Sequence, residues 1–287
     1  MLEYVCLERS EAMTNRTVSI IMGIYNCAAT LGEAIASVLA QTFQDWELIL
    51  CDDGSKDETY SIAKTYQEKY PDKIILLQNE RNMGLNYTLN RCLQEAQGEY
   101  VARMDGDDIS VPTRLEKLVK ALNENSQFVV VSSSMIRFDE SGEWGQNQVI
   151  LFPEKKDFLK HSPFFCHAAS MIRRDVFLEV DGYTVHKNLL RVEDCHLWFK
   201  IYSKGYKGMN LEEPLYKMRD DQNATSRRTV RNRLNIIYVT WIGFKMIKMP
   251  WYAYVYAIRT TLLELLKIVT PTFIYKIIHK RRNKKTQ

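Results

Sequence analysis

The first half of the chain alternates short apolar runs with segments in which apolar residues recur at helical spacing. Ala34, Val38 and Leu39 show that spacing between the first two runs. The runs with the length and content of buried strands are Val18–Met22, Trp46–Leu50, Lys73–Leu77, Tyr100–Met104 and Phe128–Val131. This alternation predicts an α/β fold with a Rossmann-like, mostly parallel sheet that helices cover on both faces.

Further elements are expected on either side of the chain's midpoint. In the first half, helices are expected over 59–70 and 86–96, and a third opens at Pro112, because proline is well tolerated in a first turn. The second half is less regular. Its expected elements are strands near Met135–Phe138, Gln148–Leu151 and Ala169–Ile172 and helices over Asp175–Val180 and Glu193–Ser203.

The C-terminal part differs from the rest in charge. From Arg227 to Gln287 there are 14 Lys and Arg residues and a single acid, Glu264, so this part carries +13 although the whole chain carries +4. A basic segment of this kind usually faces a polyanion, either anionic lipid or nucleic acid. We therefore expect an N-terminal extension at 1–15, a folded domain at 16–226 with halves at 16–125 and 126–226, and a basic amphipathic helical region at 227–287.

The apolar stretches of this basic region are too short to cross a membrane. Ile236–Phe244, Trp251–Ile258 and Leu262–Val269 are separated by Lys, Arg or Pro, and none reaches the roughly 20 apolar residues that a span requires. Their aromatic and cationic content suits helices that lie on an anionic membrane surface. Two alternatives stay open: an ordinary helical cap with a solvated basic tail, and RNA binding, for which no motif accompanies the charge.

Cysteine usage and the N-terminal sequence indicate the compartment. The six cysteines are scattered without a C-x-x-C pair, which is typical of a reducing cytoplasm and argues against a structural zinc site. The first 24 residues contain no apolar core of a secretory signal. We therefore expect a cytoplasmic protein.

Three carboxylates crowd into the four residues Asp105-Gly106-Asp107-Asp108, directly after the fourth predicted strand. Like charges this close repel, so the arrangement is costly unless a positive charge lies among them. Hard divalent cations such as Mg²⁺ and Mn²⁺ take oxygen ligands, and Mg²⁺ tends to bind through one or two carboxylates plus substrate phosphates. The alternative is an acidic turn that caps the next helix, because Asp is a good N-cap residue.

Polar residues also follow the other predicted strands. Tyr25 and Asn26 follow the first strand, Asp53 follows the second, and Asn82 and Gly84 follow the third. In a sheet of this type, ligands bind beyond the carboxyl ends of the strands, where all these loops open. The pattern therefore favours a ligand site over chance acidic turns. No GxGxxG follows the first strand and no GxxxxGK[ST] occurs, which disfavours dinucleotide and P-loop sites.

A second acid pair, Glu193-Asp194, comes just before the apolar stripe of a predicted helix. Acids in the first turn of a helix are stabilised by its dipole, so capping is one interpretation. Action on a substrate is the other, and spacing alone does not decide between them.

Taken together, these motifs resemble the family 2 glycosyltransferases of the GT-A fold over about residues 16–226. The segments that carry the resemblance are Val18–Asn26, Gln41–Phe43, Trp46–Leu48, Asp52–Ser55, Asn82–Leu85, Ala102–Asp108, Gly182-Tyr183 and Glu193–Trp198. Within the family the chain looks most like the EpsE-type enzymes of bacterial exopolysaccharide, capsule and biofilm synthesis, on the segments Met22–Cys27, Pro163–His167 and Leu215–Arg219.

The resemblance implies an inverting, metal-dependent glycosyltransferase that takes its sugar from a nucleotide-sugar donor, most often a uridine diphosphate (UDP) sugar. Asp107 is implied to hold the divalent cofactor, manganese or magnesium, that bridges both phosphates. Asp194 is the implied general base, and Glu193 orients that base or binds the acceptor. The implied nucleotide-binding residues are Gly23, Tyr25, Asn26, Asp53, Asn82, Gly84 and Asp105. In that set Tyr25 packs on the base, Asp53 accepts a hydrogen bond from it, and Asp105 engages the ribose.

Two further residues keep two interpretations each. His167 contacts the acceptor or the diphosphate, or it is a satisfied core histidine between apolar neighbours. Arg219 pairs with the diphosphate, or it closes a local ion pair near Asp220 and Asp221.

The resemblance also implies partners and a location. The QxxRW element and the long transmembrane helices of processive synthases are absent, which indicates transfer of one sugar and not polymerisation. The implied acceptor is a polyprenyl-linked glycan, with the protein peripheral on the inner face of the bacterial cell membrane through 227–287 and no nucleic acid bound. Two other functions stay open. Nucleotidyltransfer is disfavoured, because such enzymes normally carry a Gly-rich loop near the first strand that binds the triphosphate, and Gly23–Ala28 holds one glycine. The other function is that of a non-catalytic protein of this fold that binds a partner.

Overall fold

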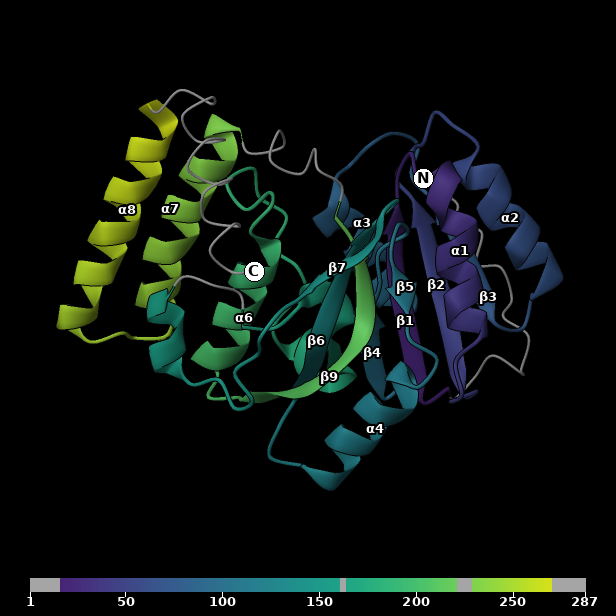
Figure 1. Ribbon diagram of the computed structural model, residues 1–287, viewed down its shortest axis with the longest axis horizontal. Helices are drawn as coiled ribbons and strands as arrows, with labels where there is room; N and C mark the ends of the chain where they lie inside the picture. Colours follow the sequence, from purple (N-terminus) through teal and green to yellow (C-terminus); the bar gives the residue numbers. More distant parts are fainter. Residues whose placement is uncertain (1–15, 161–163, 221–228, 270–287) are drawn as a thin grey trace, which may run out of the picture. The chain divides into compact units, whose positions relative to one another are not determined.

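The computed structural model describes residues 16–160, 164–220 and 229–269 (Figure 1). The chain divides into two compact units. The first contains the described residues of 16–153, 164–183 and 205–220, and the second those of 154–160, 184–204 and 229–269. The division of the sequence into 16–226 and 227–287 stays a prediction.

The first unit is built on one nine-stranded sheet with the spatial order β3-β2-β1-β4-β8-β6-β9-β5, in which β7 pairs with β6. Its strands are β1 (Val18–Ile24), β2 (Trp46–Asp52), β3 (Ile74–Gln78), β4 (Tyr100–Arg103), β5 (Ile109–Ser110), β6 (Val130–Asp139), β7 (Gly142–Gln146), β8 (Met171–Arg173) and β9 (Gly208–Arg219). Strands β3, β2, β1 and β4 are parallel, and so are the long strands β6 and β9. Antiparallel pairs join β4 to β8, β8 to β6, β9 to β5 and β6 to β7. The predicted mostly parallel sheet is therefore confirmed.

Helices of the first unit connect the strands as predicted. They are α1 (Ala28–Leu39), α2 (Thr59–Lys69), α3 (Leu85–Glu95), α4 (Arg114–Glu124), α5 (Arg174–Glu179) and the short 3-10 helix η3 (His167–Ala169). Helix α4 begins at Arg114, so Pro112 precedes the helix by two residues and does not lie in its first turn as predicted. Because the N-cap position of α4 is Thr113 and β5 intervenes, the Asp105–Asp108 segment does not cap this helix.

The sheet is covered on both faces because its central strands are apolar on both. Val18, Ile20 and Met22 of β1 share one core with buried residues of α1, α2 and α4. The alternate residues of β1 point to the opposite face, where α3 packs. At Gly23 a Cβ atom would lie 3.2 Å from side-chain atoms of Leu85 and Thr88, so glycine lets α3 approach β1 closely.

The second half of the sheet departs from the sequence prediction in three places. The strands expected at Phe128–Val131 and Met135–Phe138 are one continuous strand, β6. The prediction of a strand at Gln148–Leu151 is wrong, and the strand that forms a hairpin with β6 is β7. Strand β9 was not predicted, because Glu212, Glu213 and Pro214 interrupt its apolar pattern. They fall where the register against β6 shifts, from Ser133 opposite Leu211 to Ser134 opposite Pro214, and a bulge of this kind tolerates polar residues and proline.

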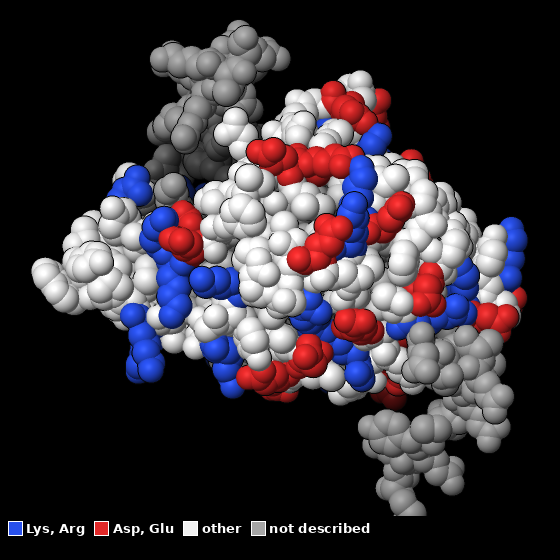
Figure 2. Space-filling view, turned by 90° about the horizontal axis from the view of Figure 1, so that it is seen from below, with Lys and Arg blue, Asp and Glu red and all other residues white. Residues whose placement is uncertain are grey.

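The second unit is helical. It contains η2 (Lys155–Lys160), α6 (Glu193–Ser203), α7 (Val230–Met246), η5 (Trp251–Ala253) and α8 (Tyr254–Val269). Among the described residues, no helix combines the length and the hydropathy that crossing a membrane requires. Around α8, Figure 2 shows a largely uncharged surface (white) with basic side chains (blue) beside it.

Candidate active site

The loops that follow β1 and β2 are joined to each other at the carboxyl edge of the sheet. Asn26 has a φ of 48°, a conformation that Asn tolerates better than most residues. In that conformation its backbone N–H donates to Ser55 Oγ at 3.0 Å, and its Oδ1 accepts from the Lys56 N–H at 2.9 Å. The Asp53 N–H also donates to the Ile24 carbonyl at 2.9 Å. The polar residues that follow the two strands therefore form one surface, as predicted.

Asp53 holds the loop that follows β3 through hydrogen bonds to its backbone. Its carboxylate is almost fully buried and accepts three hydrogen bonds: from Asn79 Nδ2 at 2.7 Å, from the Met83 N–H at 2.7 Å and from the Gly84 N–H at 2.9 Å. Gly84 takes a φ of 90° at this point, and a Cβ added there would meet no other atom within 4 Å. Asp53 therefore determines where Asn82, an exposed residue of the same loop, is presented.

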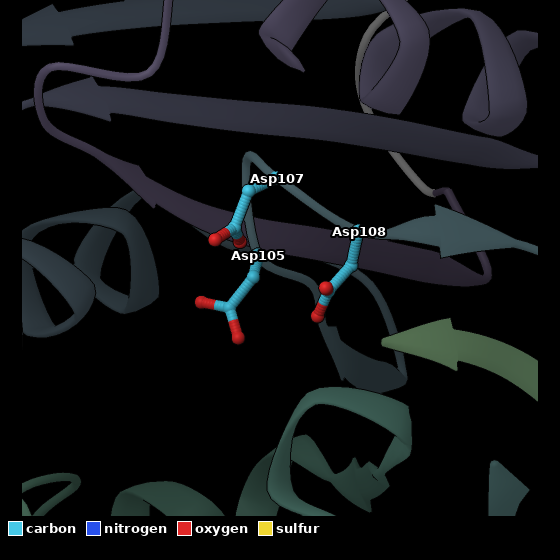
Figure 3. Close-up of side chains that lie close together, drawn as sticks. All are labelled: Asp105, Asp107 and Asp108. Atoms are coloured by element: carbon cyan, nitrogen blue, oxygen red, sulfur yellow. The ribbon is translucent and has the colours of Figure 1, made fainter. Parts of the chain in front are cut away.

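Asp105, Asp107 and Asp108 form a compact acidic cluster in the loop between β4 and β5. One carboxylate oxygen from each lies within 4.8 Å of the others, and Figure 3 shows all three carboxylates turned to the same side. Oxygen ligands at this spacing suit a hard divalent cation. Of the sets of at least three acidic, His or Cys residues in the described chain that could hold an ion, this is the one found.

A buried cation, Arg103, lies at the base of the acidic cluster. Its guanidinium forms an ion pair with the Asp105 carboxylate. Burial alone would lower the pKa of Arg103, but the neighbouring Asp105 carboxylate outweighs it and the pKa is raised. No role was predicted for Arg103 from the sequence, although an arginine in an otherwise apolar strand was the available signal.

The C-terminal end of β9 holds the acidic loop from the other side. The Asp105 N–H donates to the Tyr216 hydroxyl at 3.1 Å, and the Asp108 carboxylate accepts from the Arg219 N–H at 2.7 Å. The Arg219 side chain donates through Nε to the Asp107 carbonyl at 3.0 Å and through Nη2 to Glu33 at 2.6 Å. Arg219 forms an ion pair, but not the local one expected near Asp220 and Asp221: its partner is Glu33 of α1, Asp220 pairs with Arg137 at 3.6 Å, and Asp221 lies outside the described residues.

Asp108 differs from its two neighbours because it is buried. Burial raises its pKa to about 8, and the Asp105 and Asp107 carboxylates add to the shift. Hydrogen bonds from the Arg219 N–H and the Tyr216 hydroxyl act in the opposite direction. Asp108 therefore binds a proton near neutral pH when no divalent ion lies beside it. Asp105 and Asp107, by contrast, face more open space.

Tyr25 and His167 lie in contrasting surroundings in the first unit. The Tyr25 side chain follows β1 and is 46% exposed, so its ring is available to a ligand. His167 lies in η3, and its Nε2 is 2.6 Å from the Tyr183 hydroxyl. Burial and then Arg103 hold the pKa of His167 well below its usual range, so it is neutral at pH 7. This geometry favours the core interpretation of His167.

Glu193 and Asp194 form the first turn of α6 in the second unit. Asp194 Oδ1 accepts from the N–H of Cys195 at 2.7 Å. Both side chains are half-buried. The expected first-turn placement of the acid pair is confirmed, and it is compatible with capping and with action on a substrate.

The fold of the chain is that of the GT-A glycosyltransferases. Staphylococcus aureus TarS, in a structure titled as a complex with UDP-GlcNAc, matches with a TM-score of 0.65 at 19% identity over 87% of this chain and 71% of that one. A longer TarS chain is matched over 39% of its length. The mannosyltransferase PcManGT from Pyrobaculum calidifontis, titled as a complex with GDP-Man and Mn²⁺, matches with a TM-score of 0.61 at 19% identity over 96% and 82% of the two chains. At these identities the likeness shows the fold, and the expected GT-A fold is confirmed.

The chain belongs to glycosyl transferase family 2, whose model matches residues 19–181. EpsE of Bacillus subtilis, which carries the name of a glycosyltransferase, is 40% identical over 92% of this chain and 94% of its own length. The amylovoran biosynthesis glycosyltransferase AmsE of Erwinia amylovora is 28% identical over 73% of this chain and 79% of its own length. The chain is thus a family 2 glycosyltransferase related to enzymes of exopolysaccharide synthesis, as the sequence predicted.

Proposed function

We propose that this glycosyltransferase moves one sugar from a UDP-sugar to a lipid-linked glycan acceptor in exopolysaccharide or capsule synthesis, with inversion at the anomeric carbon. The observation that carries the proposal is the acidic cluster of Asp105, Asp107 and Asp108 at the carboxyl edge of the sheet. Relatives named for amylovoran and teichuronic acid biosynthesis support the polysaccharide context.

The chemistry of the donor set fits a divalent cation. Three carboxylates share the cluster with one buried counter-charge, Arg103, so a bound cation would relieve their repulsion. Asp107, with Asp105 beside it, would hold Mn²⁺ or Mg²⁺ together with the donor diphosphate. The ion, when bound, stabilises the negative charge that develops on the departing nucleoside diphosphate.

The first unit supplies the remaining contacts of the donor. Tyr25 offers an exposed ring for the base, and the loop presented by Asp53 brings Asn82 and Gly84 to the same edge. Because the Asp53 carboxylate accepts three hydrogen bonds within the protein, its main contribution is to hold this loop. Asp105 is oriented by its ion pair with Arg103 and is proposed to engage the ribose.

Asp194 is proposed as the general base that removes the proton of the acceptor hydroxyl, with Glu193 beside it to orient the base or the acceptor. General-base assistance is typically worth about 10²–10⁴-fold in rate. Asp194→Asn should therefore lose most turnover while donor binding persists. Asp175→Asn is a matched control, because Asp175 Oδ1 accepts the N–H of the following residue, Val176, at 2.7 Å in the first turn of α5, as Asp194 does in α6. Equal loss of turnover in both variants would contradict the assignment.

The acceptor is proposed to be carried by a polyprenyl lipid at the inner face of the cell membrane. The basic region at 227–287 would then keep the enzyme at that surface and raise its effective concentration near the acceptor.

The donor is tested with a panel of nucleotide sugars scored by thermal stabilisation of the protein in manganese. A ligand that binds the folded state alone raises the melting temperature, by an amount set by its concentration relative to its Kd. We expect UDP-sugars to stabilise the wild type in manganese and to lose most of that effect in EDTA or with Asp107→Ala. Stabilisation by UDP-sugars that is unchanged in Asp107→Ala would overturn the proposed site.

A further inference from the structure

Helix α8 has its polar side turned inward and its apolar side turned outward. The residues that α8 buries are Ala257, Thr260 and Glu264, which recur three and four positions apart on one face. The opposite face, which we call the outer face of α8, consists of Val255, Ile258, Leu262, Leu265, Leu266 and Val269, all of them exposed. An ordinary surface helix shows the reverse arrangement, with apolar residues toward the core.

The orientation of α8 is fixed by specific polar contacts within the second unit. Glu264 is 5% exposed in its side chain, and its Oε2 pairs with Arg233 Nη1 of α7 at 3.1 Å. Its other oxygen forms an ion pair with Lys267. Trp241 of α7 donates through Nε1 to Thr261 Oγ1 at 3.0 Å. Rotating α8 to hide its leucines would break the contact of Glu264 with Arg233 and that of Thr261 with Trp241, so the outward apolar face is a property of the fold.

The outer face of α8 is long and continuous. A helix of 16 residues extends for about 24 Å at 1.5 Å per residue. Leu262 is 63% exposed and Val269 is 75% exposed. At the N-terminal end of the helix, the neighbouring Trp251 is 84% exposed. A contiguous apolar surface of this kind on a soluble protein marks an interaction site.

The charges around the outer face of α8 indicate which kind of partner binds it. Arg259 is exposed beside that face, and Lys245 and Lys248 are exposed at the end of α7 that leads into α8. The 18 residues that follow α8, at 270–287, contain six Lys and Arg residues and no acid. A second copy of the chain would bring the same cations together and be repelled, whereas anionic phospholipid headgroups would attract them. Trp251 and Tyr252 are the residue types that favour the boundary between water and lipid.

We propose that the outer face of α8 inserts into the headgroup boundary of a bilayer that contains anionic phospholipid, with the helix axis parallel to the membrane. None of the described helices is suited to cross a bilayer, which agrees with an interfacial position. Helices of this type bury their apolar face about 5–10 Å into the boundary. The inference deepens the proposed function, on which it rests for the lipid-borne acceptor, by naming the surface that meets the membrane.

The test is cosedimentation of the full-length chain with vesicles, without any sugar donor. One set of vesicles is phosphatidylcholine, and the other is an equal mixture of phosphatidylcholine and phosphatidylglycerol. We expect binding to the mixed vesicles, weakened by added salt, and a loss of about tenfold or more in partitioning for Leu262→Glu, because burial of a leucine is lost. Leu262→Gln should also bind more weakly, which separates lost insertion from repulsion by the anionic lipid.

Leu178→Glu is the matched control for the added charge. Leu178 is 44% exposed on α5 in the first unit, and the variant should bind vesicles like the wild type. Wild-type binding by both Leu262 variants would overturn the proposal. So would a wild type that is dimeric without lipid and becomes monomeric with Leu262→Gln, because the occupant would then be a second copy.

Vesicle binding and donor binding are read separately. Leu262 lies in the second unit, and the acidic cluster lies in the first. Thermal stabilisation by UDP-sugars in manganese should therefore be the same for Leu262→Gln and the wild type. If the wild type binds the donor but not the vesicles, the membrane inference alone is wrong. If it binds the vesicles but not the donor, the proposed donor site alone is wrong.

Discussion

Arg219 donates hydrogen bonds to two consecutive residues of the acidic loop. Its Nε lies 3.0 Å from the Asp107 carbonyl oxygen, and its backbone nitrogen lies 2.7 Å from Asp108 Oδ1. The guanidinium also pairs with Glu33 at 2.6 Å and lies 4.5 Å from the centre of the Phe138 ring. With its donors and its face engaged in this way, Arg219 is better placed to position the acidic loop than to grip a diphosphate.

Replacing Arg219 by Lys should loosen the metal site. Lys keeps the positive charge and the backbone bond to Asp108, but it lacks the Nε–H that reaches the Asp107 carbonyl. Loss of a hydrogen bond from a charged donor costs about 1.5–3 kcal/mol of folding free energy. We expect UDP to bind several-fold more weakly in manganese and unchanged in EDTA, as measured by calorimetric titration.

Glu33→Gln is the control for Arg219→Lys. It removes the exposed ion pair and leaves the Nε bond to Asp107 in place, so its effect should be small. If Arg219→Lys weakens UDP binding equally in manganese and in EDTA, then Arg219 contacts the diphosphate directly.

Removing the buried cation should make the protein more dependent on manganese. Arg103→Met leaves the partly exposed Asp105 carboxylate without its partner, and leaving a polar group unpaired costs about 1–3 kcal/mol. A bound divalent ion restores positive charge at the same place. We therefore expect a lower melting temperature without metal and a larger rise on adding manganese than in the wild type.

Arg173→Met is the matched control for Arg103→Met. Arg173 is a half-buried arginine of β8 whose side chain donates to the carbonyls of Phe128 and Leu122, away from the acidic cluster. That variant should lose stability without a larger response to manganese. An equal manganese response in the two variants would show that Arg103 does not serve as the counter-charge of the cluster.

Two glycines with positive φ allow an effect on the donor loop to be distinguished from a general loss of stability. Gly84 has a φ of 90° and Gly142 a φ of 113°, and no atom lies within 4 Å of a Cβ built at either position. Alanine at such angles costs about 1–3 kcal/mol. Gly84→Ala and Gly142→Ala should therefore lose similar free energies of unfolding in urea. Only Gly84→Ala should weaken UDP binding, because Gly84 donates to Asp53 in the donor loop. Equal UDP binding by both variants would remove that loop from the donor site.

The sequence predicted the parts of the site that follow from strand ends. Apolar runs mark β1 to β4, so the positions of Tyr25, Asp53 and Asp107 at one edge follow from the parallel order of those strands. What holds these residues could not be predicted. The bond from Asn79 to Asp53 joins two loops, and no local pattern indicates it.

Contacts across distant strands were the other part that the sequence did not reveal. Arg219 reaches Asp107 because β9 pairs with β5 and β6, and the polar bulge of β9 hides this strand from any period-two pattern. Arg103 carried a readable signal, since a charged residue in a buried strand requires a partner. That partner, Asp105, is two residues away.

Asp108 should make the stability of the metal-free protein fall as the pH rises. Its pKa is raised from 3.8 to about 8 in the folded state, mainly by burial. Between these values the folded state binds one proton more than the unfolded state, so the free energy of unfolding falls as the pH rises, by at most about 1.4 kcal/mol per pH unit. This contribution to stability is fully present below the unfolded pKa and is lost progressively as the pH rises to the folded pKa of about 8.

Urea unfolding in EDTA at pH 5 and pH 8 measures this slope. Asp108→Asn keeps a side-chain oxygen that can accept the Arg219 N–H, and it cannot ionise. Its unfolding free energy should therefore change less over this range than that of the wild type. Asp139→Asn is the control, because the pKa of that carboxylate is lowered, not raised, by hydrogen bonds from the Ser141 side chain and backbone. A wild-type slope that survives in Asp108→Asn would mean that another group takes up the proton.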